Sequence, residues 1–130
     1  MPLKFTREQI EKVLENAKRL VQGGAYSISP RDKNMMFTDE YNLTTDKFKK
    51  IFLDIAVEDF HTAEYNNNDR FSPDDVCYIF VPQVMLADVS GDLKHHNVYV
   101  KFVLVVRKIS DAVIVISFHE AEQSVNYPFR

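Results

Sequence analysis

Apolar residues form their longest runs in the last third of the chain. Two such runs, Asn97–Arg107 and Ala112–Glu120, are separated by a short polar break. Each has about the length and the Val, Ile and Phe content of a buried strand. Two runs of this kind on either side of a short polar loop are typical of an antiparallel pair. We therefore predict that the chain ends in a long β-hairpin.

The same pattern predicts the register of this hairpin. Side chains alternate between the two faces of a strand, so a slip of one residue would move every apolar side chain to the wrong face. Matching apolar with apolar positions requires a loop with an odd number of residues, centred near Ile109. It places Tyr99 opposite His119 and puts Lys101 and Ser117 on their face. We therefore expect a phenol, an ammonium group and an imidazole at one edge of an apolar sheet.

Helical spacing of apolar residues characterises the first half of the chain. Between Thr6 and Gln22, apolar side chains recur every three or four residues, and Thr6 has the spacing of a capping box with Gln9. The two glycines that follow can end this helix. A second amphipathic helix is predicted to begin after Thr44 or Thr45 as N-cap.

Shorter elements are predicted between and after these helices. They are a strand at Ala25–Ser29, a helix at Asp32–Tyr41, and strands at Val57–Thr62 and Val76–Val84. Residues 86–96 are predicted to form a loop with a turn at Ser90-Gly91. Helices that precede a run of strands indicate an α+β fold, in which two to three N-terminal helices pack on a mostly antiparallel sheet.

Length and composition suit a single domain over residues 1–130, since 45% of these residues are hydrophobic. The one cysteine, Cys77, cannot form an internal disulfide, which is typical of a reducing cytosol. The N-terminus lacks the apolar core of a signal peptide, and no apolar stretch approaches the roughly 20 residues that cross a bilayer. We therefore expect a cytoplasmic protein with no membrane partner.

Charge is distributed unevenly along the chain. Residues 54–93 contain nine acidic residues and one arginine, whereas the segments on either side have more basic than acidic residues. A net charge of −3 does not favour general nucleic-acid binding, because that affinity grows with the number of phosphates neutralised. A local basic site remains compatible with this pattern, and so does a solvated acidic surface in the middle of the chain.

No motif predicts a cofactor. The chain has no glycine-rich phosphate loop and no serine nucleophile elbow. His95 and His96, together with Asp88 and Asp92, could be read as metal ligands. Adjacent histidines in a polar loop are more often unliganded, so we predict no metal site.

The polar cluster of the hairpin has the chemistry that metal-free RNA cleavage requires. The reaction needs a base for the ribose 2′-hydroxyl, a cation for the crowded phosphorane and an acid for the leaving 5′-oxygen. His119 can act as acid or base near neutral pH. Lys101 can supply positive charge, and Tyr99 can donate a hydrogen bond or stack on a base. The plainer alternative is that these side chains only face water at the end of a sheet.

Three segments of the chain resemble the MqsR family of toxins. The strongest similarity is in the hairpin, where Asn97–Lys101 resembles the family's Val-Tyr-x-Lys strand and Val113–Glu120 resembles its Val-Ile-Val-Ser-Phe-x-Glu strand. The segment Leu20–Gly24 resembles the family's Leu-Val-x-x-Gly helix end, and Glu58–Phe60 resembles its Ser-Asp-Phe-Tyr segment. The end of the hairpin looks like a Gram-positive or phage variant.

This resemblance implies a RelE-like fold and the function of a type II toxin, a hydrolase that cleaves mRNA without a metal and is inhibited by a cognate antitoxin. Position by position, the family's catalytic tyrosine falls on Tyr99 and the lysine of its last strand falls on His119. Its other lysine falls near Thr62, where the neighbouring His61 is expected to assist. Its middle-strand glutamine falls near Tyr78. With Lys101 as the phosphate-binding cation, Tyr78 and Ser117 are the expected substrate contacts.

Two alternatives stay open. The chain could be a non-enzymatic interaction protein, such as a phage-type inhibitor of a host protein, that acts through the acidic residues between Asp54 and Asp92. It could also be an orphan domain without activity. RNA sequence preference, the identity of the antitoxin and the oligomeric state are left open.

Overall fold

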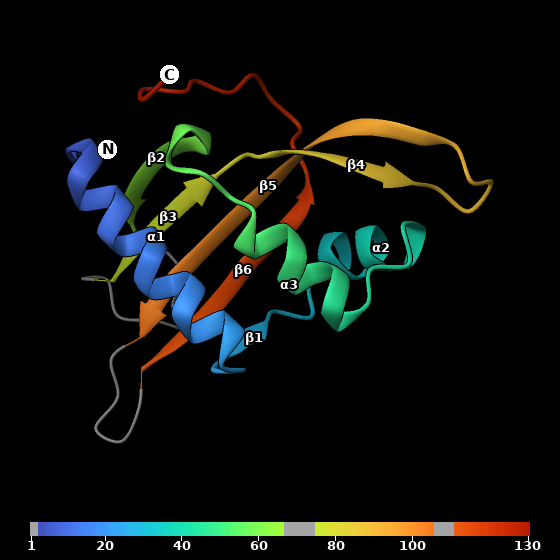
Figure 1. The fold of residues 1–130 in the computed structure, drawn as a ribbon, viewed down its shortest axis with the longest axis horizontal. Coiled ribbons are helices and arrows are strands. Elements are labelled where there is room, and N and C mark those ends of the chain that lie inside the picture. Colours follow the sequence, from blue (N-terminus) through green and yellow to red (C-terminus); the bar gives the residue numbers. More distant parts are fainter. Residues whose placement is uncertain (1–2, 67–74, 106–110) are drawn as a thin grey trace.

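The computed structural model of the chain describes residues 3–66, 75–105 and 111–130. Over these residues the fold is α+β, with three helices packed against a mixed sheet (Figure 1). The elements are α1 (Arg7–Gln22), β1 (Tyr26–Ile28), α2 (Asp32–Glu40), α3 (Thr45–Leu53), the 3-10 turn η1 (Val57–Asp59), β2 (Phe60–Tyr65), β3 (Val76–Phe80), β4 (Gln83–Ala87), β5 (Leu93–Val105) and β6 (Ala112–Glu120).

The sheet has the order β1-β6-β5-β3-β2, and β4 pairs with the first part of β5. β1 runs parallel to β6, and the other pairs are antiparallel. α1 and α3 lie across one face of the sheet (Figure 1), and α2 packs against β6. The predicted α+β architecture, with a mostly antiparallel sheet and a long C-terminal hairpin, is confirmed.

The two predicted amphipathic helices begin directly after their predicted N-cap residues. Thr6 and Gln9 make both hydrogen bonds of a capping box at the start of α1. The α1 stripe is buried against the sheet, and Gly24 follows the helix with a φ of +85°, a conformation that favours glycine. Thr44 is the N-cap of α3, where its hydroxyl accepts a hydrogen bond from the Lys47 N–H.

The core between the helices and the sheet is rich in phenylalanine. Phe48 and Phe52 of α3 reach Phe118 and Phe102 of the sheet, with ring centroids 5.0 Å and 5.4 Å apart. All four side chains are almost fully buried. This packing fixes which face of β5 and β6 lies under the helices. The other face carries Tyr99 and Lys101 beside a small buried apolar cluster of Cys77, Val103 and Ile116.

The hairpin register is the predicted one at the open end of the hairpin. Tyr99 pairs with His119, and Lys101 pairs with Ser117. The predicted odd-numbered loop is wrong, because the last pair joins residues 105 and 112 and leaves six residues between them. A β-bulge at Ile116 takes up the extra residue, so the register changes between the loop and the polar cluster.

Three other boundaries differ from the predicted ones. The predicted strand Val57–Thr62 begins as η1 and becomes a strand only at Phe60. The predicted strand Val76–Val84 is two strands, because Pro82 has no N–H for a ladder and separates β3 from β4. The predicted loop at residues 86–96 is a hairpin arm, formed by β4 and the start of β5. None of the described helices is long and apolar enough to cross a membrane.

Candidate functional site

Tyr99 and His119 stack on the face of the sheet that α1 and α3 leave uncovered. Their ring centroids are 5.5 Å apart and the ring planes differ by 13°. Val98 and Val100, on either side of Tyr99, point into the core below the helices. Because side chains alternate along a strand, Tyr99 and Lys101 share the opposite face. The predicted meeting of phenol and imidazole is therefore present.

A pocket of about 310 Å³ opens at this stack. His61 of β2 lines it together with Tyr99 and His119, although 38 residues separate His61 from Tyr99 in the chain. The remaining lining comes from residues 121–125, which follow β6. Three of the four predicted catalytic residues thus reach one cavity.

The last ten residues form a strap over this end of the sheet. This segment, Ala121–Arg130, is called the C-terminal strap and runs from β6 past β5 and β3 toward β2 (Figure 1). It contains no helix or strand, but it is anchored along its length. The Tyr127 hydroxyl donates to the Val81 carbonyl at 2.8 Å, Phe129 stacks on Phe60 at 5.4 Å, and Arg130 pairs with Asp59 at 3.3 Å. The strap is therefore the outer wall of the pocket.

His61 is engaged by the strap through one ring nitrogen. Its Nδ1 lies 2.8 Å from the Asn126 carbonyl oxygen and 3.1 Å from the Asn126 nitrogen. Nδ1 donates to the carbonyl when it carries a proton and accepts from the N–H when it does not, so one of the two bonds exists in each tautomer. Proton transfer by His61 would therefore use Nε2.

Lys101 reaches the predicted face but shares its charge with a carboxylate. Its Nζ lies 3.5 Å from Glu64 Oε1 of β2, and the lysine side chain is largely buried. A phosphate that approaches this face would compete with Glu64 for the ammonium group. Lys101 is thus placed beside the stacked pair, as the alternation along β5 requires, rather than at the wall of the pocket.

Ser117 is buried, and Arg31, a residue that sequence reasoning missed, contacts it. The Arg31 Nη1 donates to the Ser117 Oγ at 3.3 Å, while the rest of the arginine is exposed. Ser117 pairs across the hairpin with Lys101, so a second cation stands near the one that was predicted. No local signal could have found this arginine, because 86 residues separate it from Ser117.

Asn34 holds the start of α2, and with it Arg31, against β6. Its side-chain amide donates to the carbonyls of Ser29 and Ile116 at 2.9 Å and 3.0 Å, and its Oδ1 accepts from the Phe118 N–H at 2.9 Å. The side chain therefore takes the place of a neighbouring strand where β1 has ended. Asn34 is 2% exposed, so these bonds are shielded from water.

Glu122 lines the pocket and is the second residue that sequence reasoning missed. Its carboxylate pairs with Lys33 of α2 at 2.6 Å. This hydrogen bond lowers the pKa of Glu122, to which the nearby charge of His119 also contributes. An anionic carboxylate at the mouth of the pocket thus faces the imidazole. The apolar and polar pattern of the last ten residues gave no signal for this contact.

The environment of Tyr99 keeps its phenol protonated. Burial raises the pKa of Tyr99, and the charges of Glu64 and Cys77 add to the effect. At neutral pH the residue is therefore a hydrogen-bond donor and a stacking surface rather than a base.

Tyr78, a predicted substrate contact, lies on the opposite face of the sheet. Its ring packs against Phe5 and Phe102, with centroids 5.8 Å away in each case. It pairs with Ala63 and Phe102 in the middle of the sheet, on the side that α1 covers. The structure therefore does not bring Tyr78 to the Tyr99–His119 pocket.

The histidines of the arm do not form a recognisable metal site. His96 Nδ1 lies 2.7 Å from Glu120 Oε1, and its ring packs on Tyr41. Asp88, at the turn of the arm, accepts hydrogen bonds from the N–H groups of Ser90 and Asp92. Over residues 3–66, 75–105 and 111–130, no three His, Cys, Asp or Glu side chains gather as metal ligands.

Comparisons with known proteins do not assign a family. No family model matches this chain, and no curated protein or solved structure matches it either. The functional argument therefore depends on the geometry of the pocket and on the chemistry of its side chains.

Proposed function

We propose that this protein is an MqsR-like endoribonuclease toxin that cleaves RNA without a metal at the Tyr99–His119 pocket. One observation carries the proposal: a phenol and an imidazole stack within 5.5 Å in a pocket that a second imidazole also lines. The cations Lys101 and Arg31 reach the same face of the sheet. A solvated sheet end gives no reason for this convergence from four separate segments.

Each side chain has a role that fits its surroundings. His119 takes the proton of the ribose 2′-hydroxyl, whose oxygen then attacks the adjacent phosphorus. Lys101 and Arg31 stabilise the charge that develops on the phosphorane. His61 gives a proton to the leaving 5′-oxygen through Nε2. The products are a 2′,3′-cyclic phosphate and a free 5′-hydroxyl, so atoms and charge balance without water.

Tyr99 positions the substrate in this scheme. Its raised pKa makes it a donor to a phosphate oxygen, and its ring offers a surface on which a base can stack. The pocket has the size of the smaller ligand sites, about 300 Å³. That size suits one unpaired nucleotide better than a duplex, so we propose single-stranded regions of mRNA as the substrate.

The proposal includes a cognate antitoxin as the protein partner and the cytoplasm as the compartment. Support for both is the resemblance of the hairpin to the toxin family, together with the cytoplasmic location of mRNA. A small DNA-binding protein encoded in the neighbouring reading frame, which restores growth when it is co-expressed, would support this part of the proposal.

The activity is tested with purified protein and a labelled single-stranded RNA in EDTA. Tyr99→Phe and His119→Ala are compared with Tyr65→Phe and His95→Ala, which change the same residue types at exposed positions away from the pocket. We expect the two pocket variants to lose cleavage and growth inhibition, His119→Ala by about 10²–10⁴-fold as for a lost general base. The proposal fails if both pocket variants stay as active as the two control variants.

The alternative of an acidic interaction surface gains little support. Four carboxylates of that segment already pair with basic groups in the described part of the chain, and these are Asp54, Glu58, Asp59 and Glu64. Asp74, which this alternative would use, lies outside the described residues. We therefore put forward the nuclease as the single proposed function.

A further inference from the structure

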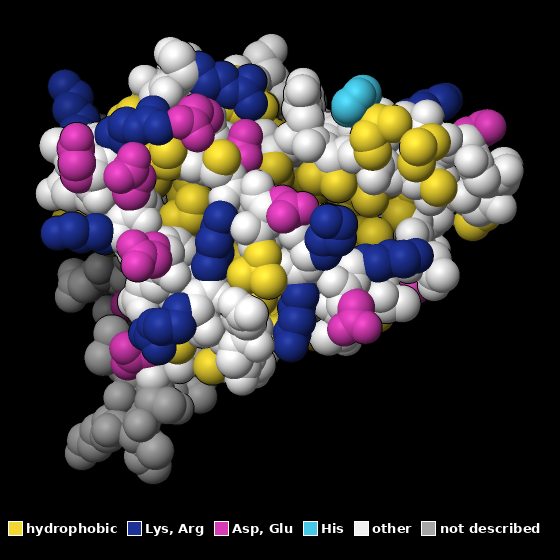
Figure 2. Space-filling view, in the orientation of Figure 1, with side chains coloured by type: hydrophobic (Ala, Val, Ile, Leu, Met, Phe, Trp, Pro, Cys, Tyr) yellow, Lys and Arg dark blue, Asp and Glu magenta, His cyan; other side chains and the backbone are white. Residues whose placement is uncertain are grey.

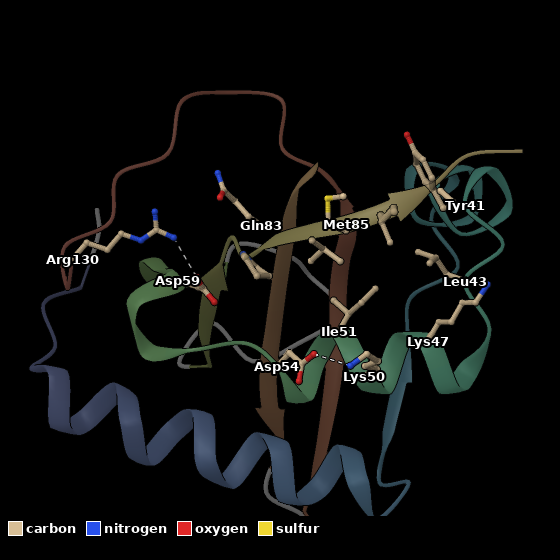
Figure 3. A pocket seen from close by; sticks show the side chains of 14 residues that line it. Tyr41, Leu43, Lys47, Lys50, Ile51, Asp54, Asp59, Gln83, Met85 and Arg130 are labelled. Carbon is tan, nitrogen blue, oxygen red and sulfur yellow. Dashed lines mark hydrogen bonds and ion pairs between the residues drawn. The ribbon is translucent and has the colours of Figure 1, made fainter. Parts of the chain in front are cut away.

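A second and larger pocket lies on the other face of the molecule, between β4 and α3. It has a volume of about 720 Å³ and follows β4 along its whole length. Leu43, Ile51, Val84 and Leu86 supply its apolar lining. Figure 3 shows Tyr41 and Lys47 at one end of this groove and Asp59 and Arg130 at the other. We call it the β4–α3 groove.

The groove runs beside a free strand edge. The Val98 N–H donates to the Pro82 carbonyl and the Asp88 N–H donates to the Asp92 carbonyl, so the even-numbered residues of β4 bond to β5. In an antiparallel ladder the alternate residues point their N–H and C=O groups the other way. Gln83, Met85 and Ala87 therefore turn theirs outward, and no strand among the described residues pairs with them.

This edge lacks the features that usually protect a strand from association. Edge strands are commonly blunted by lysines, prolines or bulges. The five residues of β4 are all uncharged, and its ladder with β5 is regular. On the arm, the apolar side chains of Met85, Val89 and Leu93 are 46%, 87% and 60% exposed. Figure 2 shows apolar surface gathered over the arm and along the groove below it. Exposure of this kind marks interaction sites.

We propose that the β4–α3 groove binds an extended segment of a partner protein as an added strand beside β4. The outward groups of Gln83, Met85 and Ala87 bond to its main chain. Every second side chain of the segment then packs on the apolar lining, above Ile51 and Leu86. This binding does not depend on the RNA cleavage proposed above, because the groove and the Tyr99–His119 pocket lie on opposite faces of the sheet.

Charge in the groove favours an acidic residue at one end of the segment. Lys50 pairs with Asp54 and Arg130 pairs with Asp59, so these four charges are already matched. Lys47 pairs with no carboxylate of the described residues, and its Nζ donates to the Asn42 carbonyl. A carboxylate of the partner near Tyr41 would therefore complement the one unmatched cation of the lining.

The same features argue against a second copy of this chain as the occupant. α3 faces the free edge of β4 across the groove, so only an isolated strand can enter between them. Two chains that paired through β4 would bring their α3 helices together. A second copy would also offer the uncharged strand β4, without the acidic residue that Lys47 requires.

The test uses a fluorescent, capped nine-residue peptide with valines at alternating positions, threonines between them and two glutamates at one end. Binding is measured by fluorescence anisotropy. Met85→Pro removes an outward N–H and keeps the bonds to β5, and Met85→Leu is its matched control. We expect Met85→Leu to bind like wild type and Met85→Pro to bind about tenfold more weakly, as for the loss of one or two main-chain hydrogen bonds.

A modified peptide keeps the test independent of folding. N-methylation of the threonine amides blocks strand pairing in the probe alone and should also abolish binding. Lys47→Glu should weaken binding of the glutamate peptide and favour a peptide with lysines in its place, whereas Lys49→Glu, outside the lining, should do neither. Circular dichroism and RNA cleavage report whether each variant is folded and keeps the separate pocket.

Three results would overturn the proposal. One is the lack of saturable binding by the wild-type protein up to about 1 mM peptide. Another is binding that survives both Met85→Pro and N-methylation, which would place the peptide elsewhere. The third is a dimer in light scattering that is lost in Met85→Pro but kept in Met85→Leu, which would assign the edge to a second copy.

Discussion

Replacement of Asn34 by alanine tests how the start of α2 is held against β6. The substitution removes three hydrogen bonds, to the carbonyls of Ser29 and Ile116 and from the N–H of Phe118. Each typical hydrogen bond contributes about 0.5–1.5 kcal/mol net. The three together give roughly 3 kcal/mol, and the 2% exposure of Asn34 leaves little water to replace them. For a domain of ordinary stability, about 5–15 kcal/mol, this loss is large.

The free energy of unfolding is measured by urea denaturation. Asn16→Ala is the matched control, since it removes a solvent-exposed hydrogen bond from Arg19 and should cost less than about 0.5 kcal/mol. Asn34→Asp keeps the acceptor for Phe118 but turns a carboxylate oxygen toward two carbonyls. Its folded-state pKa should rise, so that variant should become less stable as pH rises through this pKa. An Asn34→Ala protein within about 0.5 kcal/mol of wild type would refute the reasoning.

Three further predictions concern the pocket and the sheet. Arg31→Ala should reduce RNA cleavage about tenfold or more, with partial recovery in Arg31→Lys. Equal activity of the wild type and both variants would contradict a phosphate contact of Arg31. Removal of the strap after Glu120 should abolish nuclease activity and lower the melting temperature, because the contacts of Tyr127 and Phe129 are lost. Unchanged activity would show that the strap is not part of the site. Burial raises the pKa values of Tyr78 and Tyr99. Because the phenols of the unfolded chain ionise first, native stability should fall as pH rises above 10.0. Tyr78→Phe should reduce this fall, as measured by denaturation at high pH.

Features set by neighbouring residues could be predicted from the sequence. The capping box of α1 lies within four residues, and the facing of Tyr99 and His119 follows from alternation along two adjacent strands. The bulge at Ile116 could not be predicted, because it depends on how β6 fits the core as a whole. The part of the site that lies within the hairpin, the pair Tyr99 and His119, was therefore predicted from the sequence.

Features set by distant segments could not be predicted. Arg31 meets Ser117 across 86 residues, and the strap closes the pocket through contacts with β2 and η1. Tyr78 shows the opposite case, because a residue placed by resemblance alone turned out to face the helices. Alternation along β3 puts Tyr78 on the face that the helices cover, and the resemblance carried no information about that face.

The most direct test of the central claim is the chemistry of the RNA ends that the purified protein produces in EDTA. Proton transfer by His119 and His61 predicts 2′,3′-cyclic phosphate and 5′-hydroxyl ends, formed by wild type and by His95→Ala but not by His119→Ala. Intact RNA with the wild-type protein, or the same products in equal amount from His119→Ala, would contradict it.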